Sequence, residues 1–146
     1  MVMPNLGPAV TITNHPQVWN INQSLRLLAS LKDMNFSQIQ ETKVQIIDSA
    51  KWYPLYMVLS NASVNFTAIG AAISIYTGPN ATGNHIFGGT PLATHTNSRI
   101  VNQINVNSGT RANTATDIFI RSDNNTGIPN ATLDVFIYGF DLGFLP

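Results

Sequence analysis

The chain has 146 residues, of which seven are Lys or Arg and seven are Asp or Glu, so its formal net charge is zero and 10% of it is charged. Soluble domains usually have about 25% charged residues, so Asn, Thr and Ser must supply most of the polar surface, with 17, 14 and 10 copies. The absence of cysteine excludes disulfides and thiolate chemistry, and the scattered basic residues give no electrostatic reason to expect nucleic acid.

Length and apolar content predict one folded, soluble domain. Domains cluster at about 100–150 residues, and 44% hydrophobic residues is too apolar for intrinsic disorder. No apolar run approaches the roughly 20 residues of a membrane-spanning helix. Residues 1–10 lack the basic and apolar regions of a secretory signal. We therefore expect neither a membrane nor a nucleic acid as partner.

Residues 1–35 are predicted to form an N-terminal arm, and the alternation in residues 9–13 would suit an edge strand. Three prolines interrupt any helix in its first part: Pro4, Pro8 and Pro16. Residues 24–34 are the best helical candidate, because three leucines follow one another at spacings of three: Leu25, Leu28 and Leu31. The same run also alternates passably as a strand, so a short helix and a strand both remain open here.

Beyond the arm, period-two alternation predicts a series of short strands. They are expected at residues 43–47, 52–60, 64–69, 73–76, 99–106, 117–121 and 133–138. Pro54 cannot donate to a ladder, so it should mark a strand start, a bulge or a solvent-facing edge. Residues 77–98 are expected to form the longest loop, and the last two strands the clearest hairpin. Residues 36–146 are thus predicted to be one all-β, antiparallel sandwich of jelly-roll type.

Catalytic motifs are lacking. The seven acidic residues show no spacing that proposes a catalytic pair. His15, His85 and His95 lack metal-ligand spacing, although the last two could meet across the 77–98 loop. Neither a nucleophile elbow nor a phosphate-binding glycine motif occurs. We therefore predict no catalytic, metal or cofactor site and no enzymatic activity.

Asparagine and aspartate are interpreted mainly as turn residues. Asp123, in Ser-Asp-Asn-Asn-Thr-Gly, superficially resembles the start of a calcium loop, but the closing Glu is missing, so a turn is favoured. Seven Asn-x-Ser/Thr triplets begin at Asn22, Asn35, Asn61, Asn65, Asn80, Asn124 and Asn130. Because no secretory signal is readable, we interpret these triplets as turn chemistry rather than glycosylation sites.

Large apolar side chains lie near both ends of the chain. They are Val18, Trp19 and Ile21 in the arm and Phe140, Phe144 and Leu145 in the tail. Apolar termini need a surface to lie against. Two alternatives remain open: these side chains pack on the chain's own core, or they contact a neighbouring subunit or a capsid.

The stretch from Trp52 to Leu142 resembles small β-sandwich virion proteins of tailed bacteriophages, in particular the cement or decoration proteins of icosahedral heads. The resemblance lies in Tyr-Met-Val-Leu-Ser-Asn-Ala-Ser-Val-Asn-Phe-Thr, Ile-Ser-Ile-Tyr-Thr-Gly and Leu-Asp-Val-Phe-Ile-Tyr-Gly-Phe-Asp-Leu. It includes no signature residue. It implies a jelly-roll body, self-association as a trimer, and binding across junctions between major capsid proteins on the outer surface of the capsid.

The leading hypothesis is a non-enzymatic capsid cement subunit that clamps the shell through several weak contacts. The alternative is a receptor- or carbohydrate-binding module of a tail fibre, using the loops at residues 77–98, 107–116 and 122–130. In that case one of three aromatic residues would stack on sugar: Trp52, Tyr53 or Tyr76. A small glycosidase is a third hypothesis, which requires two carboxylates to converge.

Overall fold

The computed structural model describes residues 25–47, 51–66, 71–92, 101–105, 112–124 and 128–143. Within these ranges the regular elements are strands: β1 Leu25–Asn35, β2 Gln40–Gln45, β3 Trp52–Ser60, β4 Ala72–Gly78, β5 Thr82–Pro91, β6 Val101–Asn105, β7 Asp117–Asn124 and β8 Thr132–Asp141. No helix in the described part is long and apolar enough to cross a membrane.

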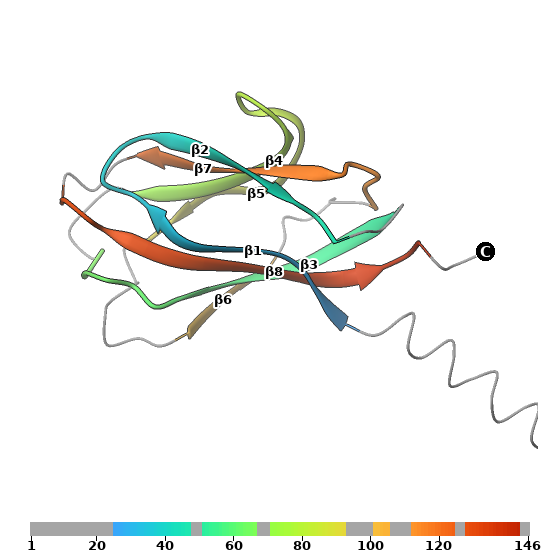
Figure 1. Cartoon of the computed structure of the whole chain (residues 1–146), viewed down its shortest axis with the longest axis horizontal. Coiled ribbons are helices and arrows are strands. Elements are labelled where there is room, and N and C mark those ends of the chain that lie inside the picture. The colour runs from blue at the N-terminus through green and yellow to red at the C-terminus, as the bar shows by residue number, and fades with distance from the viewer. Residues whose placement is uncertain are drawn as a thin grey trace, which may run out of the picture.

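The strands form two antiparallel four-stranded sheets that lie one above the other (Figure 1). The orders are β1-β8-β3-β6 and β2-β7-β4-β5. The pairs β1/β8, β2/β7, β3/β6 and β4/β5 are those of a chain folded back on itself and rolled up, which is the strand order of an eight-stranded jelly roll. The predicted all-β sandwich of jelly-roll type is confirmed.

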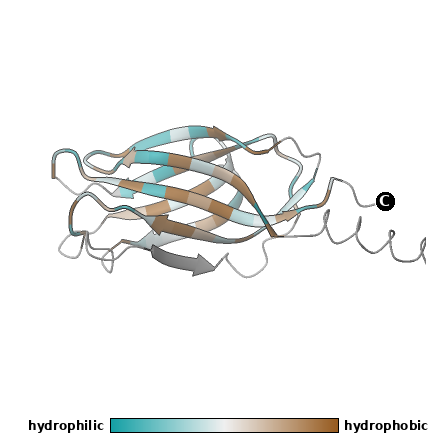
Figure 2. Cartoon of the chain, turned by 60° about the horizontal axis from the view of Figure 1, so that its bottom comes forward, coloured by the Kyte–Doolittle hydropathy of each residue, from teal (hydrophilic) through white to brown (hydrophobic). Residues whose placement is uncertain are grey.

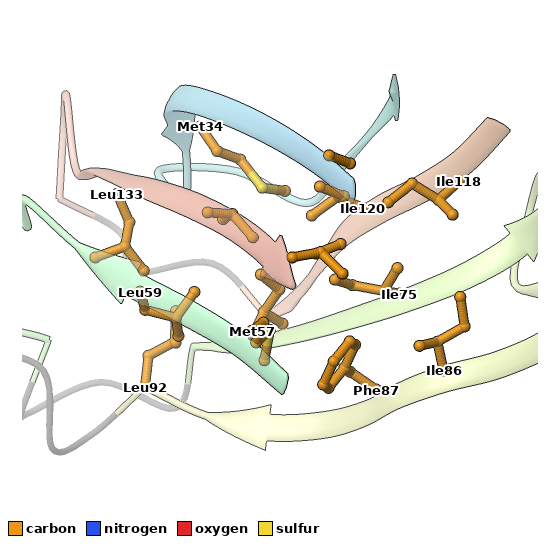
Figure 3. Packing of buried hydrophobic residues seen from close by; sticks show 14 of the residues in the cluster. Met34, Met57, Leu59, Ile75, Ile86, Phe87, Leu92, Ile118, Ile120 and Leu133 are labelled. Atoms are coloured by element: carbon orange, nitrogen blue, oxygen red, sulfur yellow. The ribbon is translucent and has the colours of Figure 1, made fainter. Parts of the chain in front are cut away.

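The core lies between the two sheets. Hydrophobic and hydrophilic residues alternate along the strands (Figure 2), as expected for sheets with one buried face. Met57, Leu59 and Leu133 of one sheet face Ile75 and Ile120 of the other, and all are at most 1% exposed (Figure 3). Such burial is the main stabilising term of the fold, at about 1.5–3 kcal/mol for each large side chain.

Trp52 connects the start of β3 to the segment that precedes β7. Its side chain is 0% exposed, and its indole Nε1 donates to the Ala115 carbonyl oxygen at 2.8 Å. Its backbone also exchanges hydrogen bonds of 2.9 and 2.7 Å with Asn113. Toward another part of the core, Phe36 and Phe66 meet edge to face, with ring centroids 5.8 Å apart.

Residues 25–35 form a strand, so the helical alternative for 24–34 is wrong. β1 pairs with β8, and its register shifts between Leu27 and Ala29. Leu28 is the additional residue of this bulge, and it is fully buried while Leu27 is exposed. The bulge breaks the period of two and leaves leucines at spacings of three, which explains the helical pattern. Residues 25–35 therefore belong to the sandwich rather than to the predicted arm.

Three further predictions need correction. Residues 82–91 form β5 rather than part of a long loop. Residues 64–66 lie outside any strand. The predicted hairpin of 117–121 with 133–138 does not exist, because β7 and β8 belong to different sheets. In contrast, β3 has the predicted bounds, and Pro54 lies at a register shift in the β3/β8 pairing, as a bulge residue would.

Four of the seven asparagine triplets show turn chemistry in the structure. Asn61, Asn80 and Asn130 have φ angles of 56°, 55° and 58°, in the left-handed region that asparagine tolerates best among residues with a side chain. The Asn35 side chain accepts hydrogen bonds from Ser37 N at 2.7 Å and Ser37 Oγ at 2.6 Å. The prediction of turn chemistry is confirmed for these four triplets. It is wrong for Asn124, which is the last residue of β7, and Asn65 lies outside any turn, while Asn22 lies outside the described residues.

Candidate functional site: two unlike outer faces

Most of the predicted contact residues lie outside the described part of the chain: Val18, Trp19, Ile21, Phe144 and Leu145. Phe140 lies on β8, in register with Leu25 of β1 and Tyr53 of β3. Trp52 is buried, so it cannot stack on a sugar as the carbohydrate hypothesis proposed. Tyr53 and Tyr76 lie on different sheets, so they do not form one site.

The outer side of the β1-β8-β3 sheet carries three aligned rows in which all residues but Ser30 are aliphatic or aromatic. Leu133, Val135 and Ile137 of β8 are at most 1% exposed and point into the core, so the residues that alternate with them point outward. The rows run across β3, β8 and β1: Tyr53–Phe140–Leu25, Tyr56–Tyr138–Leu27 and Val58–Phe136–Ser30. We call these nine residues the apolar face.

The apolar face is ordered by side-chain contacts and is partly open to solvent. The rings of Tyr56 and Tyr138 stack with centroids 5.3 Å apart and planes inclined by 25°. Leu25 and Leu27, on the edge strand β1, are 46% and 40% exposed. Contiguous apolar surface of this kind marks an interaction site more often than isolated exposed leucines do.

A groove of about 360 Å³ adjoins the apolar face at the β1 edge. It lies between residues 27–30 of β1 and residues 45–47 at the end of β2. Ile47 N donates to the Leu28 carbonyl oxygen at 2.9 Å and so connects the two segments that line the groove. Its polar side chains are those of Ser30 and Gln45, and its other side chains are aliphatic.

The outer side of the β2-β7-β4-β5 sheet has a different character. One row crosses all four strands in register: Lys43 of β2, Phe119 of β7, Tyr76 of β4 and His85 of β5. We call it the cross-sheet row. The rings of Tyr76 and His85 stack with centroids 4.3 Å apart and planes inclined by 4°. Tyr76 is half-buried and His85 is exposed.

Charged and polar residues flank the cross-sheet row on both sides. On one side the register places Glu41 beside Arg121 and Arg121 beside Ser74. On the other side it places Gln45 beside Asp117. The cross-sheet row therefore combines aromatic rings with hydrogen-bonding groups, whereas the apolar face offers mainly hydrocarbon.

The ionic groups of this sheet are paired with one another. Lys43 Nζ lies 3.2 Å from Asp117 Oδ2, and Arg121 Nε lies 3.1 Å from Asp123 Oδ1. The Glu41 carboxylate accepts from the Asn80 backbone N–H, with both oxygens 3.1 Å away.

Asp123 lies in a strand rather than in the predicted turn. It belongs to β7 and accepts hydrogen bonds from Ser74 Oγ and from Arg121. Ser74 Oγ in turn accepts from Gly89 N at 2.9 Å. Among the residues that the structure describes, no group of three or more His, Asp or Glu side chains could hold a metal ion. His95 lies outside them, so whether it meets His85 is not tested.

No family model and no curated protein matches the chain. Among solved structures, the chain is similar to chitosan-binding module 1 derived from a chitosanase/glucanase from Paenibacillus sp. IK-5. The TM-score is 0.40 and the identity is 12%, over 81% of this chain and 96% of that chain. The jelly-roll assignment above rests on the strand order and pairing of this chain itself.

Proposed function

We propose that the protein is a non-enzymatic structural subunit of a virion, a cement protein that binds the outer surface of a phage capsid through its apolar face. The observation that carries the proposal is the alignment of aromatic and aliphatic side chains across β3, β8 and β1. Tyrosine and phenylalanine are enriched at the centres of protein interfaces, and charged residues are depleted there. The three rows that define the apolar face contain no charged residue.

The size of the apolar face fits a contact that works in several copies. Three strands about 4.8 Å apart and three rows about 6.8 Å apart cover roughly 300 Å². A stable protein interface takes about 800 Å² from each partner. One apolar face therefore supplies a weak contact, and several faces on one assembly raise the effective concentration of each remaining contact.

Symmetry indicates that binding to the capsid and association into a trimer use different surfaces of the chain. A single patch is complementary to itself only around a twofold axis, whereas a trimer needs two different surfaces. We therefore assign the apolar face to the major capsid protein. The proposed homotrimer uses another surface of the chain.

Leu27→Glu is a suitable test of the apolar face. Leu27 is 40% exposed on an edge strand, so a charge there leaves the core intact. Ile39→Glu is the matched control, because Ile39 is 54% exposed and lies between β1 and β2, outside the apolar face. We expect Leu27→Glu, but not Ile39→Glu, to lose retention on purified capsids in co-sedimentation. Equal retention of both variants would contradict the assignment.

Two measurements address the oligomer and the location. Sedimentation velocity over a concentration series should show a trimer, and a monomer of 15.9 kDa at every concentration would refute self-association. Antibodies against the chain should label virion heads in electron micrographs. Labelling of tail tips instead would favour the alternative, a receptor- or carbohydrate-binding module of a tail fibre.

A further inference from the structure

The two outer faces of the sandwich differ in chemistry, and only one is used by the proposed function. The apolar face belongs to the β1-β8-β3 sheet, and the cross-sheet row belongs to the opposite layer (Figure 1). A subunit attached through the apolar face would therefore turn the cross-sheet row away from the shell. We infer that the cross-sheet row is a second binding site, and that its ligand is an uncharged oligosaccharide.

Aromatic stacking is the first argument for a sugar. Sugar rings present C–H groups on their faces, and the negative face of an aromatic ring attracts them. Tyr76 and His85 stack on each other with planes only 4° apart, so each ring supports the other in one orientation. β5 is an edge strand of its sheet, so none of the described strands pairs with it on the side away from Tyr76. His85 is exposed, so its outer ring face is not covered by any strand that the structure describes.

The shape of the row is the second argument. Its four residues lie on four adjacent strands, which at about 4.8 Å per strand spans roughly 14 Å from Lys43 to His85. A row of that length suits an extended oligosaccharide rather than a single sugar. Glu41 and Arg121 on one side, and Gln45 on the other, can exchange hydrogen bonds with hydroxyl groups.

The charge balance is the third argument, and it favours a neutral ligand. Lys43 and Arg121 each have a carboxylate partner on the same sheet, at 3.2 and 3.1 Å. The Glu41 carboxylate is held by the backbone of the β4–β5 turn at Asn80. Because the cations are already paired, an acidic glycan or a phosphate would have to compete with Asp117 and Asp123 for them.

The test is isothermal titration calorimetry of the full chain with four neutral hexasaccharides: cellohexaose, chitohexaose, maltohexaose and mannohexaose. We expect at least one to bind, with affinity reduced about tenfold or more by Tyr76→Ala and by His85→Ala. Tyr76→Phe keeps the ring and should bind within about twofold of the parent. Far-UV circular dichroism confirms that each variant is folded, and His85→Ala changes only an exposed side chain.

Two results would overturn the inference: no binding of any of the four hexasaccharides, or binding that both alanine variants leave unchanged. The inference depends on the proposed function only for the outward direction of the row. Leu27→Glu separates the two, because it should abolish capsid retention and leave hexasaccharide binding intact. If the parent protein binds capsids but none of the hexasaccharides, the second site alone is refuted and the proposed function is not.

Discussion

Gly139 lies where β8 comes closest to both of its neighbours. A Cβ built on Gly139 would lie 2.1 Å from the Tyr53 carbonyl oxygen, 2.9 Å from Pro54 Cα and 2.8 Å from Leu28 Cδ1. The first two atoms belong to the backbone, so a rotamer change cannot relieve them. The bulges in β1 and β3 are both adjacent to this position, which makes glycine the residue that allows the three strands to pack.

Gly139→Ala should destabilise the protein by about 3 kcal/mol, the upper part of the usual range for overpacking. The contact with Tyr53 must open by about 1 Å to reach an ordinary C···O distance of about 3.3 Å. That movement displaces β8 relative to β3 and disturbs the packing of Leu28. At about 2–4 °C per kcal/mol for a chain of this size, the melting temperature should fall by about 6–12 °C.

Urea unfolding followed by tryptophan fluorescence gives the free energy of unfolding, with Gly89→Ala as the control. Gly89 has a φ of 41° but no atom within 4 Å of a built Cβ, so its substitution measures backbone strain alone, at about 1 kcal/mol. Combining Gly139→Ala with Leu28→Ala should cost less than the sum of the two, because the latter removes one of the three contacts. A Gly139→Ala protein within about 0.5 kcal/mol of the parent would refute the steric argument.

Three further substitutions test local features, the first two by the same unfolding assay and the third by thermal melts. Ala81 has a φ of 59° in the β4–β5 turn, so Ala81→Gly should raise the free energy of unfolding by about 1 kcal/mol. Ala115→Gly is the control: Ala115 has no positive φ, so glycine there should lower the free energy of unfolding. Asp134 is 8% exposed and accepts from the Asp33 N–H at 2.8 Å, so Asp134→Ala should cost about 2 kcal/mol; an unchanged stability would show that this bond is dispensable. Trp52→Phe removes the indole hydrogen bond and should cost about 1–3 kcal/mol in thermal melts, and a smaller loss would assign the residue's role to packing alone.

The sequence predicts the fold best where local pattern and tertiary pairing agree. The bounds of β3 are predicted correctly because its run from Trp52 to Ser60 is rich in aromatic and aliphatic residues. The turns at Asn61, Asn80 and Asn130 were predictable because asparagine tolerates positive φ, which all three adopt.

Prediction failed where the strands are irregular. In β1 the bulge at Leu28 changes the phase of the alternation. The leucines of this strand therefore recur at spacings of three, which is typical of a helix. In β5, Gly83, Gly88 and Gly89 read as loop residues. The structure instead places Gly83 at the start of the hairpin, and the β4/β5 register shifts several times along the strand. Glycine has the same local signature in a loop and in an irregular strand.

The two faces could not be predicted, because they depend on register between distant strands. Alternation in β8 indicates that Phe136, Tyr138 and Phe140 share a side, but it does not indicate which strands lie beside them. The false hairpin of 117–121 with 133–138 would have placed these aromatics beside β7 rather than β3. The cross-sheet row could not be predicted either. Tyr76 and His85 are paired in the β4/β5 hairpin, and the sequence predicts a loop for residues 77–98.

The rolled-up strand order has a consequence for how the chain folds. The turn at Asn80 and Ala81 joins β4 to β5, and the remaining pairs β3/β6, β2/β7 and β1/β8 close loops of increasing length around it. Closing a longer loop loses more conformational entropy. The β4/β5 hairpin therefore has the smallest entropy cost of formation and the β1/β8 pair the largest. Dominance of non-local pairs places such domains in the millisecond-to-second class of folding rates. During synthesis, β1 is made first among the described strands, and β8, its partner among them, leaves the ribosome last. The exposed leucines of β1 are then a site where nascent chains can associate.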